Sequence, residues 1–214
     1  LETIQAVTDL GVEVLTGAEE AAFSFQGASV GGGAPGDGLL ADIGGGSTEL
    51  VSYQNGAITS GCSLPMGSLS LFAKHVSGLF PTKEERKAIR AHVEGELEKA
   101  RTAGLHCSHL TGVGGTIRAA AKLCNDLSGA DPDNRVIPVG EIKALYKDLK
   151  KGDQDTLRQI LRSVPDRVHT ILPGLAILTA VLRAYEVETV SVSTCGVREG
   201  YLLNRVMGVK GSHE

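Results

Sequence analysis

The sequence has few aromatic residues and no tryptophan: Phe, Tyr and Trp together make up 4% of its 214 residues. Apolar residues of all kinds still make up 42%, which is enough to bury a core, so an intrinsically disordered or collagen-like chain is excluded. The formal charge is only −4, and there is no excess of basic residues. This composition argues against a general nucleic-acid-binding protein.

Long apolar runs and paired cysteines are also missing. No run reaches the about 18 residues that a membrane-spanning helix needs, and the first residues lack the basic and apolar blocks of a secretory signal. None of the four cysteines forms a C-x-x-C pair, and a chain of this length does not need disulfides. We therefore expect reduced thiols in a cytoplasmic protein that binds neither membrane nor nucleic acid.

Glycine, in contrast, is abundant: the chain has 28 glycines, whereas average usage of about 7% would give about 15. The glycines punctuate a pattern of short apolar runs and helical periodicities that predicts a mixed α/β fold. Asn55-Gly56 predicts a hairpin between two of the first strands. We predict strands over 11–15, 39–43, 49–53, 57–64, 110–113 and 189–193. We predict helices over 18–26, 82–103, 116–123, 139–151, 154–163, 167–185 (interrupted at Pro173-Gly174) and 197–206, and a Gly-rich loop or connection over 27–38.

One Gly-rich turn, D-I-G-G-G-S-T-E-L over residues 42–50, joins two of the expected strands. Glycines let the backbone approach an anion closely, and successive N–H groups of a tight turn form an anion-binding concavity. Asp42 and Glu49 flank the turn, where oxygen ligands could hold Mg²⁺ or another divalent cation beside phosphate. The alternative is an ordinary hairpin turn with solvated acids. The candidate phosphate-binding residues here are Gly44, Gly45, Gly46, Ser47 and Thr48.

A second Gly-rich turn, L-T-G-V-G-G-T-I-R-A over residues 110–119, leads from a strand into a helix. Helix N-termini attract anions through free N–H groups and the helix dipole. Gly114, Gly115 and Thr116 are therefore candidate phosphate-binding residues, although the same pattern is also a common α/β connection. Arg118 follows the turn and could either reach a phosphate or be an exposed helix arginine.

Together, the two turns resemble those of the actin-like ATPase and sugar kinase superfamily, in which two ribonuclease-H-like domains clamp phosphates. More narrowly, the sequence resembles the exopolyphosphatase / guanosine pentaphosphate phosphatase (Ppx/GppA) family. The resemblance implies a ribonuclease-H-like α/β domain with a mixed sheet, three leading antiparallel strands and flanking helices. The matches are T-G-A-E-E-A (16–21), residues 42–50, G-V-G-G-T-I-R-A (112–119), L-P-G-L-A-I-L (172–178) and, more weakly, G-V-R-E-G (196–200).

The family resemblance implies Mg²⁺-dependent hydrolysis of the terminal phosphoryl group of polyphosphate or of guanosine penta-/tetraphosphate. It assigns activation of the attacking water to Glu20, with Glu19 as the less favoured base, and a substrate contact to Arg198. A solvated helix carboxylate is the alternative for Glu20. Two other functions stay open at this point: an ATP-dependent phosphotransferase or ATPase of the same superfamily, and a non-catalytic regulator that binds polyphosphate or alarmones.

The sequence departs from the family pattern at one point. The D-x-G-S-N-S hairpin that precedes the glutamate motif in the family is absent. We therefore expect residues 1–36 to be the C-terminal part of a first actin-like domain with its connection, and residues 37–214 to be the second, phosphate-binding domain. On this view the chain alone has little hydrolase activity, and an exposed interdomain face could support a homodimer.

Overall fold

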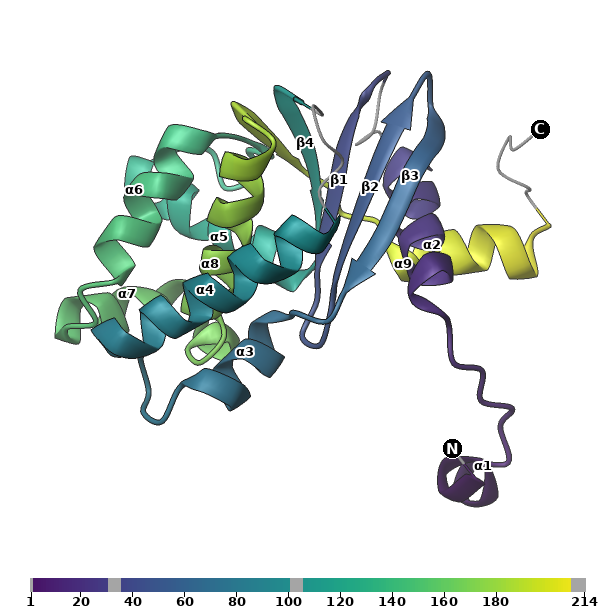
Figure 1. The fold of residues 1–214 in the computed structure, drawn as a ribbon, viewed down its shortest axis with the longest axis horizontal. Helices are drawn as coiled ribbons and strands as arrows, with labels where there is room; N and C mark the ends of the chain where they lie inside the picture. The colour runs from purple at the N-terminus through teal and green to yellow at the C-terminus, as the bar shows by residue number, and fades with distance from the viewer. Residues whose placement is uncertain (1, 31–35, 101–105, 209–214) are drawn as a thin grey trace.

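A six-stranded mixed sheet organises the part of the chain that the computed structural model describes, residues 2–30, 36–100 and 106–208 (Figure 1). The strand order is β3-β2-β1-β4-β6-β5. The central strand β1 is buried along its whole length, as expected for a strand covered on both faces. The strands are β1 Gly38–Ile43, β2 Thr48–Gln54, β3 Ala57–Leu64, β4 His109–Val113, β5 Val136–Pro138 and β6 Thr189–Val192.

The first three strands form consecutive antiparallel hairpins, as predicted. In the β2–β3 turn, Asn55 and Gly56 both have positive φ, 50° and 76°, which is the geometry that favours Asn-Gly. Strand β4 runs parallel to β1, and β6 runs parallel to β4, whereas β5 is antiparallel to β6. The carboxyl ends of β1, β4 and β6 therefore lie at one edge of the sheet.

One face of the sheet is covered by the helices that lie on the left in Figure 1. The apolar helix α8 is at their centre, with eleven of its residues buried, and it packs against α3, α4, α5 and α6. The large core between this layer and the sheet includes Leu110, Ile117 and Leu175. The helices are α3 Ser68–His75, α4 Lys83–Ala100, α5 Gly115–Ser128, α6 Val139–Leu149, α7 Gln154–Ser163 and α8 Ile171–Ala184.

The other face carries α2 (Gly17–Val30) and α9 (Val197–Tyr201), which continues as a π-helical turn over Leu202–Val206. A Cβ on Gly27 would overlap the carbonyl of Gly196, and a Cβ on Gly200 would overlap that of Phe23. Because these positions are glycines, α2 and α9 cross in backbone contact. Helix α1 (Glu2–Thr8) lies apart from both layers, at the end of an extended segment (Figure 1).

Several predicted boundaries were wrong. Residues 11–15 form no strand, and α2 continues through Gly27 to Val30, where a loop was predicted. Helix α8 begins at Ile171 and is not interrupted at Pro173, because the proline lies in the first turn, where its missing N–H costs no helical hydrogen bond. Helix α4 was predicted to Ala103, but residues 101–103 lie outside the described part. No helix among the described residues is long and apolar enough to cross a membrane.

Candidate phosphate site

The two Gly-rich turns lie side by side at the carboxyl ends of β1 and β4. The parallel register pairs Asp42, one residue before the end of β1, with Val113, the last residue of β4. A Cβ on Gly114 would lie 2.7 Å from both the Asp42 Oδ1 atom and the Ile43 carbonyl oxygen. The structure thus brings together two turns that are about seventy residues apart, at the sheet edge where open α/β sheets bind ligands.

The first turn combines bound carbonyl groups with unpaired backbone N–H groups. Its carbonyls face the N-terminus of α3: the Gly45 carbonyl accepts hydrogen bonds from the N–H groups of Leu69 (3.0 Å) and Ser70 (2.9 Å). The N–H groups of Gly45, Gly46 and Ser47 have no acceptor within the described part of the chain. Such a row of free donors in a tight turn can bind an anion.

The two hydroxyl residues of the first turn differ. Thr48 is buried and donates its hydroxyl to the Met66 carbonyl at 2.6 Å, so its side chain is used by the fold. The Ser47 hydroxyl interacts with the Glu49 carboxylate and lowers its pKa. The Thr48 hydroxyl could therefore contact a phosphate only if its hydrogen bond to the Met66 carbonyl broke. The Ser47 hydroxyl, in contrast, belongs to the polar surroundings of Glu49.

The second turn opens α5. Gly114 has φ +95° and is the N-cap of α5, and as a glycine it has no side chain that could accept a hydrogen bond. The first N–H groups of α5 therefore have neither an intrahelical partner nor a side-chain cap. Thr116 is 3% exposed and packs against Gly174, where a Cβ would lie 2.9 Å from the Thr116 Oγ1 atom. The guanidinium of Arg167 lies over Gly115 and adds positive charge at this helix end. The free donors here are backbone groups, and the Thr116 side chain belongs to the core.

Asp42 and Glu49 are cross-strand partners in β1 and β2, with exposed fractions of 8% and 3%. Ser24 donates its hydroxyl to Asp42 Oδ2 and Ser63 donates its hydroxyl to Glu49 Oε1, each at 2.7 Å. Burial raises the pKa of both carboxyl groups above their ordinary values, and these hydroxyl bonds partly oppose the shift. Neither Ser24 nor Ser63 was predicted from the sequence, although both support the acids directly.

Glu20 lies beside this acid pair. Gly17, at the start of α2, packs against Ser63, and the negative charge of Glu20 raises the pKa of Glu49 further. Glu20 makes no hydrogen bond or ion pair within the described part of the chain. Among the predicted bases, Glu20 therefore has a carboxylate that is not committed to the fold.

Glu19 has a different role. It accepts hydrogen bonds from the N–H and hydroxyl groups of Thr16, both at 2.9 Å, and forms a 3.0 Å ion pair with Arg205. The hydrogen bonds with Thr16, followed by the Arg205 charge, lower the Glu19 pKa. Glu19 thus caps α2, which is the physical reason to prefer Glu20 as the base.

Two exposed arginines lie near the same edge of the sheet. The charge of Arg118, in the first turn of α5, lowers the pKa of Asp42. Arg198 is in the first turn of α9, where the neighbouring Glu199 accepts a 2.7 Å hydrogen bond from the Gly196 N–H. A Cβ on Gly196 would lie 4.0 Å from Asp42 Oδ2, so the start of α9 faces the acid pair. The substrate contact of Arg198 stays a prediction.

A model of the Ppx/GppA phosphatase family matches residues 1–207. The chain belongs to this family. Its structure is similar to that of the Aquifex aeolicus PPX-GPPA enzyme, with 29% identity and a TM-score of 0.78, over 95% of this chain and 69% of that one. It is also similar in fold to an exopolyphosphatase from Cytophaga hutchinsonii, with 24% identity and a TM-score of 0.80, over 98% of this chain and 70% of that one.

These matches confirm the predicted fold class, a mixed-sheet α/β domain of the actin-like type. They also establish the chain as a member of a phosphatase family. The domain boundary at residue 36 and the individual site residues stay predictions. Helix α2 precedes that boundary, yet it packs on the same sheet as the helices that follow the boundary.

Proposed function

We propose that this Ppx/GppA family member hydrolyses the terminal phosphoanhydride bond of inorganic polyphosphate, of guanosine pentaphosphate (pppGpp), or of both. The observation that carries the proposal is the set of unpaired N–H groups in the first turn. Helix α3 binds its carbonyls, so that the N–H groups of Gly45, Gly46 and Ser47 are free beside a buried acid pair. Fixed donors of this kind stabilise the negative charge of a phosphoryl group during transfer without reorganising.

In this proposal the acidic side chains and the backbone N–H groups have separate roles. Glu20 orients the attacking water and accepts its proton, since its carboxylate is not used for capping. The N–H groups of the first turn and of the start of α5 bind the phosphate oxygens, and Arg198 adds a charged contact from α9.

The residues present fit a divalent cation. Ser24 and Ser63 hold one oxygen of Asp42 and one of Glu49, and they leave Asp42 Oδ1 and Glu49 Oε2 as further oxygen ligands. Within the described ranges, no three His, Cys, Asp or Glu side chains form a ready-made metal cluster. This donor set suits Mg²⁺, which commonly binds one or two carboxylates and completes its shell with water and substrate phosphates. When bound there, Mg²⁺ would neutralise charge on the phosphate chain.

The experiment is phosphate release by the full-length natural protein from tripolyphosphate, long-chain polyphosphate, pppGpp and ATP, with and without Mg²⁺. We expect Mg²⁺-dependent release from at least one of the first three and slower release from ATP. Preferential turnover of ATP would instead support an ATPase, and tight binding without turnover would support a regulator. Either result would contradict the proposed activity.

A further inference from the structure

A basic groove leads away from the second glycine turn along α5 and α7. Two neighbouring cavities form it. The first, of about 220 Å³, begins at Gly115 and Arg118, and the second, of about 600 Å³, reaches Arg158 and Arg162. Both are lined by Lys122 and Ser163, so they lie next to each other.

The cations of the groove are ordered by helical spacing. Arg118 and Lys122 are four residues apart on α5, and Arg158 and Arg162 are four residues apart on α7, so each pair lies on one helix face. From Gly115 to Lys122 the helix rises by about 10 Å. The groove therefore presents positive charge at successive distances from the turn.

Three of these cations form no ion pair with the described part of the protein. Arg158 pairs with Asp155 at 3.0 Å, and Arg167, which lines the first cavity, pairs with Asp166 at 3.1 Å. The remaining acid of the groove, Asp126, accepts the Ser163 hydroxyl and keeps its charge, so the two cavities are lined by five cations and two acids. None of the ion pairs within residues 2–30, 36–100 and 106–208 involves the three other cations, which are Arg118, Lys122 and Arg162.

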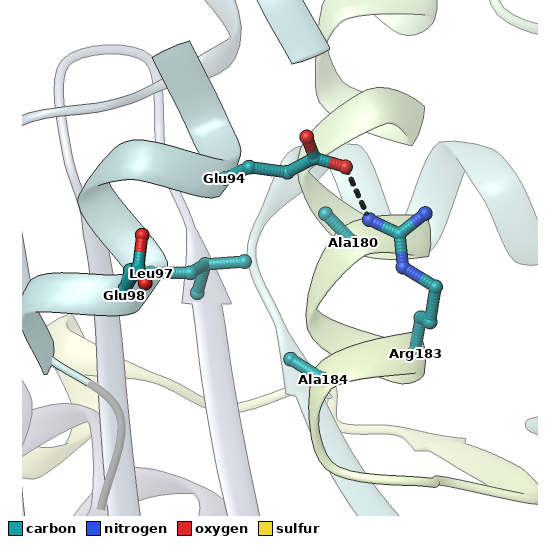
Figure 2. Close-up of a pocket in the computed structure, with 6 residues that line it drawn as sticks. All are labelled: Glu94, Leu97, Glu98, Ala180, Arg183 and Ala184. Atoms are coloured by element: carbon teal, nitrogen blue, oxygen red, sulfur yellow. Dashed lines mark hydrogen bonds and ion pairs between the residues drawn. The ribbon is translucent and has the colours of Figure 1, made fainter. Parts of the chain in front are cut away.

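The groove between α4 and α8 shows that this charge is not a general property of the surface. That groove, of about 320 Å³, carries Glu94 and Glu98, and its cation Arg183 is paired with Glu94 at 2.5 Å (Figure 2). It would repel a polyanion. Other cations that are unpaired within the described residues, such as Lys143 and Lys147 on α6, lie on exposed helix faces, whereas those between α5 and α7 line two adjacent cavities.

We propose that the α5–α7 groove binds the phosphates that follow the terminal group of a linear polyphosphate, so that long chains are preferred over tripolyphosphate. The proposal rests on the proposed function, because the terminal phosphate must lie at the glycine turns. A basic groove with low-dielectric walls concentrates a polyanion locally. A three-phosphate chain bound at the turn does not reach Lys122 and Arg162, whereas a long chain extends past both residues.

The test compares Lys122→Gln/Arg162→Gln with Lys143→Gln/Lys147→Gln, a double variant that removes the same charge from the exposed face of α6. We expect the groove variant of the full-length natural protein to raise KM for long-chain polyphosphate by about tenfold, with KM for tripolyphosphate changed less than about twofold. The α6 variant should match the wild type. Equal effects on both substrates, or no effect on either, would overturn the proposal.

Direct binding separates this proposal from the hydrolase activity. If the wild type releases phosphate from none of tripolyphosphate, long-chain polyphosphate and pppGpp, the proposed function fails, and calorimetry with long-chain polyphosphate still tests the groove. Weaker binding by the groove variant than by the α6 variant, with equal thermal stability of the two, would support the groove. Equal binding by both would overturn it.

Discussion

The two glycine turns lie side by side but use glycine for different reasons. A Cβ on Gly46 would meet no atom within 4 Å, so no part of the described protein fills that space. A Cβ on Gly114 would meet Asp42, and one on Gly115 would meet the Arg167 guanidinium. The first turn therefore leaves space for a ligand at Gly46, whereas the second turn needs glycine at position 114 for the fold.

The two turns also differ in charge. The first turn is flanked by the acids Asp42 and Glu49, with Glu20 nearby, and the second by the cations Arg118 and Arg167. A phosphoryl group placed between them would face water-activating and metal-binding groups on one side and positive charge on the other. Each prediction below alters one side of this arrangement.

The largest effect is expected on the acidic side. Glu20→Gln should lower kcat for phosphate release by at least about a hundredfold, because an amide cannot accept the proton of the attacking water. Glu19→Gln is the matched control, and it should cost less than about tenfold, since Glu19 only caps α2 and pairs with Arg205. Steady-state kinetics of both variants measures this, and an inverted order would place the base at Glu19.

The metal-binding prediction comes next. Asp42→Asn and Glu49→Gln should each raise the Mg²⁺ concentration needed for half-maximal activity by about tenfold or more, because each removes a charged ligand. Asp148→Asn, on exposed α6, should leave the Mg²⁺ dependence unchanged. An unchanged Mg²⁺ requirement in both acid variants would rule out this pair as the metal site.

Alanine substitutions test the different uses of glycine. Gly114→Ala should destabilise the fold by about 1–3 kcal/mol, because alanine is strained at φ +95° and its Cβ would overlap Asp42. Gly46→Ala should change the free energy of unfolding by less than about 0.5 kcal/mol but weaken tripolyphosphate binding. Urea unfolding and calorimetry measure the two effects. Similar destabilisation by both substitutions would contradict the distinction between the turns.

The smallest effect concerns pH. Asp42 and Glu49 have folded-state pKa values above their ordinary values of 3.8 and 4.5. The folded state therefore holds more protons than the unfolded state just above those values, so stability falls as pH rises through this interval. Asp42→Asn removes one contribution, and its unfolding free energy should fall less steeply with pH than that of the wild type. Parallel curves from urea unfolding at several pH values would contradict this.

Local patterns were sufficient to predict much of the fold. The predicted Asn55-Gly56 turn forms. The predicted start of a helix near residue 82 is also correct, and the Thr82 N–H donates a 2.7 Å hydrogen bond to Glu85 there. These features depend on residues close in sequence. The Gly-Gly turn before α5 was found for the same reason.

The missed features depend on long-range contacts. A two-residue loop at Asn55-Gly56 would place Cys62 opposite Glu49, but a bulge at Ser52/Tyr53 shifts the register and brings Ser63 there. Helix α3 was not predicted, and its close packing needs Gly67, where a Cβ would overlap the Gly45 backbone. No short motif encodes either contact, yet both shape the first turn and its acid pair.

The central claim is that the two turns together bind a phosphate chain. Amide NMR spectra of the chain, titrated with Mg²⁺ and tripolyphosphate, test it without relying on turnover. We expect the largest shifts at Gly45, Gly46 and Ser47 and at Gly115 and Thr116, and small shifts in the α4–α8 groove around Glu94. Saturating binding that leaves both turns unshifted would contradict the account.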